Sequence, residues 1–125
     1  DIHVEVPAVK YDYLSSEPTG ESSEKIRERV QAAREVQLHR FRAHPHLFSN
    51  AHMGPQEIRS FCRIDGKSEE LLKMAITRLG LSARAYDRIL KASRTIADLE
   101  GEVDIRSHHV AEAIQYRSLD RKLWE

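Results

Sequence analysis

The sequence has little of what several classes of protein require. It contains one cysteine, so no disulfide can form within the chain. Its unbroken apolar runs are only a few residues long, far below the roughly 18 residues of a membrane span. Its 20 lysines and arginines balance its 20 aspartates and glutamates, so the chain as a whole is not attracted electrostatically to nucleic acid or membrane. Its first residues do not follow the order of a signal peptide. We therefore expect a soluble, cytoplasmic protein.

The first residues are expected to form an isolated strand. Asp1 to Pro7 alternate apolar and polar side chains, as a half-buried strand does, and no second strand follows. Because a lone strand cannot satisfy its backbone hydrogen bonds, we interpret it as the last strand of a larger sheet domain that precedes this chain. Residues 8–22, with Pro18, Gly20 and several serines, are typical of a linker. We therefore expect two parts: a strand and linker over residues 1–22, and a helical domain over residues 23–125.

Helical periodicity dominates from residue 23 onward, and the sequence predicts an all-α domain of four to five helices. The expected helices cover residues 23–42, 55–62, 68–79 and 83–100, and a last one starts after Ser107. Residues 65–67 are expected to form a turn. Gly80 and Gly101 are expected to end the third and fourth helices. The residues expected to cap helix N-termini are Ser22 or Ser23, Ser68, Ser82 and Ser107.

The helix over residues 83–99 has one polar face, which carries Arg84, Asp87, Arg88, Lys91, Arg94, Thr95 and Asp98. Arg84 lies near the second helical position, where the helix dipole disfavours a cation by about 0.3–1 kcal/mol. Arg88, one turn later, adds a like-charge repulsion of about 0.2–0.5 kcal/mol. A bound anion would reverse both effects, but Asp87 could also offset them. The helical pattern alone leaves both explanations open.

Three segments carry a family resemblance: LSARAYDRILKASRTIADLEG, then DIRSHHVAEAIQYRSLDR, and, before both, NAHMGPQEIRSFCRID. They resemble the C-terminal helical domain of magnesium-chelatase-like AAA+ ATPases of the bacterial ComM/YifB type. The opening DIHVEVP is similar to the strand that follows the arginine-finger segment in those proteins. The resemblance implies an α/β nucleotide-binding core and a helical lid. This chain would be the AAA+ lid bundle, preceded by the orphan β-strand of the truncated core.

The resemblance also implies roles for individual residues. Arg84 matches sensor 2, the lid arginine that reaches the γ-phosphate of ATP in cis or from a neighbouring subunit. Arg88 does not match that motif position, and it and Lys91 are candidates for subunit or phosphate contacts. ATP and Mg²⁺ would be bound in the full-length parent and not by this chain. The sequence has no Walker A loop, so the chain alone is not expected to be an enzyme.

The same resemblance implies partners. The parent would be a DNA-processing ring ATPase or helicase that acts in natural transformation as a hexamer. This chain would contact its own core domain and the neighbouring subunits, with DNA bound through the full-length protein and no membrane partner. The candidate DNA contacts in the basic helix 23–42 are Arg27, Arg34 and Arg42, although such a face is more often plain solvated surface.

Two other functions compete with the lid. The helix 68–79, a turn and a second helix led by Arg84 and Arg88 have the form of a helix-turn-helix, although Asp87 and Asp98 interrupt the basic face and the chain has no net charge. A role of the parent in metal chelation is the other alternative.

The remaining candidates for chemistry are histidines and the cysteine. No cysteine or carboxylate joins the histidines at a known ligand spacing, so we expect no metal site in this chain. Cys62 follows Ile58 and Phe61 on a short helix and is expected to be a core thiol. The histidines considered were His39, His44, His46, His52, His108 and His109.

Overall fold

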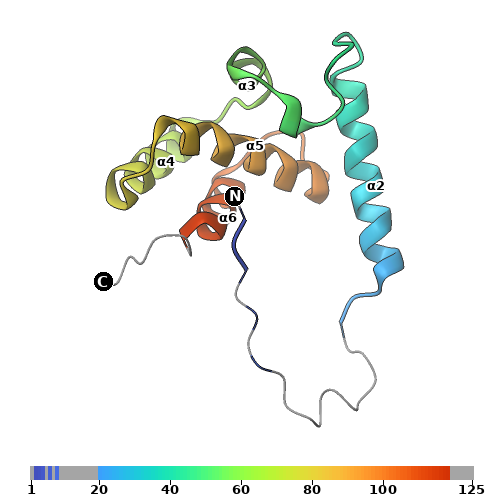
Figure 1. Ribbon diagram of the computed structural model, residues 1–125, viewed down its shortest axis with the longest axis horizontal. Coiled ribbons are helices and arrows are strands. Elements are labelled where there is room, and N and C mark those ends of the chain that lie inside the picture. The colour runs from blue at the N-terminus through green and yellow to red at the C-terminus, as the bar shows by residue number, and fades with distance from the viewer. Residues whose placement is uncertain (1, 5, 7, 9–19, 119–125) are drawn as a thin grey trace.

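The chain folds into a helical bundle, seen in a computed structural model that describes residues 2–4, 6, 8 and 20–118 (Figure 1). The all-α prediction is confirmed for these residues. No helix among them is both long and apolar enough to cross a membrane. With the labels of Figure 1, the elements are α2 (Ser23–Arg40), η1 (Asn50–His52), α3 (Pro55–Phe61), α4 (Gly66–Leu79), α5 (Ala83–Glu100) and α6 (Ser107–Ser118).

The expected N-terminal strand is not found in the part of 1–8 that the structure describes. Residues 2–4, 6 and 8 have no regular secondary structure, while residues 1, 5 and 7 lie outside the described part. The His3 backbone N–H donates to the Tyr116 carbonyl of α6 at 2.9 Å. The segment therefore contacts a helix, and the described residues offer no second strand with which a sheet could form. Most of the expected linker, residues 9–19, also lies outside the described residues.

The predicted ends of α2 and α5 follow from local capping. Ser22 caps α2, because its hydroxyl accepts the Lys25 N–H at 3.2 Å, and the helix ends at Arg40, two residues before the predicted end. Ser82 caps α5 by accepting the Ala85 N–H at 3.3 Å. Gly80 and Gly101 end α4 and α5 with φ of 61° and 78°, in the left-handed conformation that glycine adopts most easily.

Two predicted N-caps were wrong. Asp65 caps α4, because its carboxylate accepts the Ser68 N–H at 2.8 Å, and Ser68 is a buried residue of the first turn. Residues 66 and 67 therefore begin the helix instead of forming a turn before it. Ser107 is itself the first residue of α6, and the side chain that bonds the backbone there is His109, which accepts the Arg106 N–H at 2.9 Å.

Helix α5 is the central element of the bundle. It packs against α2, α3, η1 and α6, while α4 packs mainly against α6. Phe41 and Phe61 meet edge to face, with ring centroids 5.3 Å apart. The largest fully buried apolar side chains are Phe41, Leu72, Ile89 and Val110.

Helix α2 buries few of its apolar side chains. Ala33 is buried, but Ile26, Val30 and Val36 are 43%, 42% and 45% exposed. Figure 1 shows α2 standing to one side of the other helices, near the C-terminal half of α5. The side chains that α2 buries are Ala33 and Gln37, so its larger apolar side chains stay exposed.

Candidate functional site

The N-terminal end of α5 presents Arg84 to solvent. Ser82 is the cap, so Arg84 is the second residue of the helix, close to the unpaired N–H groups and the positive end of the helix dipole. Its side chain is exposed and has no hydrogen bond or ion pair to any described residue. Asp87 therefore forms no direct ion pair with Arg84. This end of the helix is positively charged and open to a ligand.

Arg88 and Lys91 lie one and two turns further along α5 and are half-buried. Both line a groove of about 670 Å³ between α5, α6 and the N-terminal residues Ile2 and Val4. The Lys91 ammonium donates to the Ala51 carbonyl of η1 at 3.1 Å. Lys91 thus already has a structural partner, and Arg84 is the most accessible of the three predicted cations on this helix.

The second half of the polar face of α5 is buried, which the helical pattern did not predict. The guanidinium of Arg40, on α2, donates one hydrogen bond to each carboxylate oxygen of Asp98, at 2.9 and 2.6 Å. The Asn50 amide donates to Asp98 at 2.9 Å, and Arg94 Nε lies 3.3 Å from the same carboxylate. The Asp98 side chain has no exposed surface. We call these four residues the Asp98 network.

The Asp98 network fixes how α2, η1 and α5 meet. The guanidinium of Arg94 also donates to the carbonyls of Glu102 and Val103, both at 3.0 Å, which ties the loop before α6 to the same centre. Burial lowers the pKa of Arg94, while the attraction to Asp98 opposes that shift. A buried carboxylate between two guanidiniums is the arrangement expected of a structural core, since buried charges persist only when paired.

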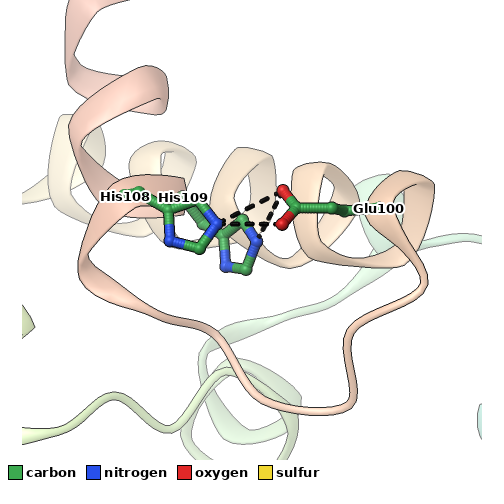
Figure 2. Close-up of side chains that lie close together, drawn as sticks. All are labelled: Glu100, His108 and His109. Carbon is green, nitrogen blue, oxygen red and sulfur yellow. Dashed lines mark hydrogen bonds and ion pairs between the residues drawn. The ribbon is translucent and has the colours of Figure 1, made fainter.

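The C-terminal end of α5 brings together three side chains that can bind a cation. Figure 2 shows both histidine rings directed at the carboxylate of Glu100. His108 Nε2 lies 3.0 Å from one carboxylate oxygen, and His109 Nε2 lies 3.0 Å from the other. The two ring centroids are 4.0 Å apart. This cluster was not predicted from the sequence, because the only signal was an adjacent histidine pair and the carboxylate lies on the preceding helix.

The two histidines have different surroundings. His109 is fully buried and its Nδ1 accepts the Arg106 N–H, so the hydrogen of the neutral ring is on Nε2 and points to Glu100. His108 is 57% exposed. The hydrogen bond from His108 lowers the pKa of Glu100 below its usual value. The carboxylate is therefore a shared acceptor that links the end of α5 to the start of α6.

The three candidate DNA contacts are all exposed: Arg27 and Arg34 on α2, and Arg42 just after its end. Arg42 Nη1 donates to the His39 carbonyl at 2.8 Å and so covers the C-terminal end of the helix. Arg27 and Arg34 form no hydrogen bond or ion pair within the described part of the chain. They lie two turns apart on one side of α2, whereas Arg84 is at the end of α5 that lies away from α2 (Figure 1). The structure therefore does not join the α2 arginines and Arg84 into one site.

The other histidines and the cysteine do not form a site. His39, His44, His46 and His52 are exposed, and among the described residues the group at the end of α5 is the one set of three or more potential ligands that converges. Cys62 is buried and unpaired, which confirms the predicted core thiol. Burial raises its pKa to about 11.

The helical architecture and the sequence together define a family. Residues 20–117 match the family described as the C-terminal part of the magnesium chelatase subunit ChlI, and the chain belongs to it. The chain is 42% identical over 124 residues to the competence protein ComM of Haemophilus influenzae and 39% identical over 124 residues to YifB of Escherichia coli. A Mycobacterium bovis protein is 32% identical over 118 residues.

These alignments cover 94–98% of this chain but only 23–24% of the length of each relative. The chain therefore spans about a quarter of the relatives that it matches. The expected resemblance to ComM and YifB is confirmed.

Proposed function

We propose that the chain is the lid domain of a magnesium-chelatase-like AAA+ ATPase and that Arg84 is its sensor 2 residue. In this role Arg84 binds the γ-phosphate of an ATP that is held, with Mg²⁺, by a core domain of the parent protein. The guanidinium stabilises the negative charge on the transferring phosphoryl group. It also makes the position of the lid depend on the bound nucleotide. The chain alone does not hydrolyse ATP.

One observation carries this proposal: Arg84 is an exposed guanidinium without a described partner on the first turn of α5. Its position is electrostatically unfavourable until an anion arrives, because it adds a cation to the positive end of the helix. The nearby N–H groups and the guanidinium fork can both bind phosphate oxygens. The Asp98 network holds the other half of α5 in the bundle, so Arg84 is presented from a rigid support.

The packing of α5 favours a lid over a helix-turn-helix. A recognition helix needs an exposed face along its length to enter a groove of DNA. Helix α5 is instead covered by α2, α3, η1 and α6, and its second half buries Arg94 and Asp98. Helix α4 packs mainly on α6. Arg84 is accessible on the first turn of α5, which suits an end-on contact with a phosphate.

The proposed parent is a cytoplasmic ring ATPase that processes DNA. Membership of the ComM and YifB family supports this, because one relative is named a competence protein. The lid would contact its own core and the neighbouring subunits of the ring. The exposed Arg27 and Arg34 would be available for DNA phosphates. The family description also suggests a part in metal chelation. The described side chains around Arg84, at the start of α5, do not support that role.

The test is the substitution Arg84→Ala in the full-length parent protein. We expect the ATP hydrolysis rate to fall by at least roughly 100-fold, as expected for the loss of a donor to a developing negative charge. DNA affinity should change by less than about twofold, because Arg84 does not contribute a DNA contact. The control is Arg59→Ala, which removes another exposed helical arginine, on α3. Unchanged ATP hydrolysis in Arg84→Ala would show that Arg84 is not sensor 2.

A further inference from the structure

We propose that Glu100, His108 and His109 form a zinc-binding site that joins the end of α5 to the start of α6. This site is independent of the role of Arg84, because it lies at the opposite end of α5. It requires only residues of this chain. Neither the family description nor the names of the relatives mention zinc.

The three side chains converge on one point. Neighbouring residues on a helix normally point about 100° apart and do not face each other. His108 and His109 are adjacent, yet both Nε2 atoms are directed at the same carboxylate (Figure 2). The ligand atoms of all three residues lie within 4.8 Å of one another. A metal ion with bonds of about 2.0–2.2 Å to nitrogen and oxygen would need only small side-chain movements to bind all three.

The donor atoms of the cluster are those that zinc prefers. Two imidazole nitrogens and one carboxylate oxygen form a ligand set typical of zinc sites that keep a fourth position open. Mg²⁺ and Ca²⁺ prefer oxygen ligands alone, so the magnesium of the family description is not the cation that this cluster favours. Glu100 and His108 are 45% and 57% exposed. Zinc can thus enter from solvent, and water or a group of a partner can occupy the fourth position.

In the absence of a metal ion, the ring hydrogen of His109 is on Nε2. Coordination through Nε2 moves this hydrogen to Nδ1 by exchange with solvent, and the Arg106 N–H then loses its acceptor. The loss of one capping hydrogen bond weakens zinc binding by about two- to thirtyfold. This cost is modest beside the affinity that three ligands confer. It also gives the site a specific signature, since zinc must change the environment of the Arg106 amide.

The experiment is a calorimetric titration of this chain, without an affinity tag, with zinc chloride at neutral pH. We expect saturable binding of one zinc ion per chain at micromolar protein. The substitutions Glu100→Gln and His108→Ala should each weaken binding by at least roughly tenfold, since each removes one of three ligands. Both side chains are exposed, so the variants should fold, which circular dichroism verifies. His109 is left intact because it is fully buried.

The control variant replaces two exposed histidines outside the cluster, His44→Ala with His46→Ala, and should bind zinc as the unchanged chain does. Zinc should also shift the amide resonance of Arg106 in an NMR spectrum of the unchanged chain, and magnesium chloride should not. The absence of saturable zinc binding would overturn the proposal. So would His108→Ala binding as tightly as the unchanged chain, or an Arg106 amide that does not respond to bound zinc.

Discussion

The Asp98 network allows the sharpest prediction about stability, through the substitution Asp98→Asn. The change keeps the volume of the side chain and removes its charge. Arg40 and Arg94, whose side chains are 13% and 6% exposed, then lose their common counter-charge. Removing one partner of a buried ion pair destabilises a protein by about 3–5 kcal/mol, because a buried charge remains uncompensated. That is a large part of the roughly 5–15 kcal/mol by which a domain is stable.

The measurement is urea denaturation at pH 7, followed by far-ultraviolet circular dichroism. Asp98→Asn should lower the free energy of unfolding by about 3–5 kcal/mol. The control Asp104→Asn changes an exposed aspartate and should stay within about 0.5 kcal/mol of the unchanged chain. The reasoning would be refuted if Asp98→Asn cost less than about 1 kcal/mol, the scale of an exposed ion pair.

A double variant shows whether the cost is caused by charge. Arg40→Met removes one of the two guanidiniums that Asp98→Asn leaves without a counter-charge. The double variant should therefore lose less stability than the sum of the single variants, by about 0.5–3 kcal/mol. Strict additivity would mean that Arg40 and Asp98 do not interact energetically, against the bidentate contact seen here. If Asp98→Asn did not fold alone, recovery of folding in the double variant would support the same conclusion.

Two further predictions follow from shifted pKa values. Burial raises the pKa of Cys62 from 9.0 to about 11. At pH 8 its thiol should therefore react with a disulfide reagent at least about 100-fold more slowly in the native chain than in urea. Equal rates would contradict its burial. Glu100 has a lowered pKa in the folded chain, so its contribution to stability is complete above its unfolded pKa of about 4.5 and is lost as the pH falls through the folded value. Between pH 5.5 and 3 the melting temperature should therefore fall more in the unchanged chain than in Glu100→Gln, and equal falls would show that Glu100 is not the responsible group.

The features that the sequence predicts correctly are local. Ser82 and Gly101 mark the two ends of α5, because a cap depends on the few residues that follow or precede it. The same reasoning placed Arg84 on the first turn. It failed at α4, where Asp65 and Ser68 are both good capping residues three positions apart. The two alternatives differ by only one helical turn, and local propensity did not decide between them.

The features that the sequence did not predict are pairings over distance. A helical wheel places Arg94 and Asp98 on the polar face, since it cannot show that Arg40, 58 residues before Asp98, supplies a buried partner. The zinc cluster was missed for a related reason. Glu100 is separated from His108 by the end of one helix, a loop and the first turn of another, a spacing that matches no common ligand motif.

Helix α5 connects both proposals while keeping them separable. Arg84 and Glu100 stand near its two ends, and a rise of about 1.5 Å per residue puts their backbones roughly 24 Å apart. The Asp98 network lies between them, on the turn before Glu100, and holds α5 against α2 and η1. Energetic coupling over such a distance requires an element with two arrangements, and a helix buried against four others has little freedom to supply one. Under the two proposals, a phosphate at the Arg84 end would therefore control the position of the whole bundle, whereas zinc at the Glu100 end would strengthen the bundle from within.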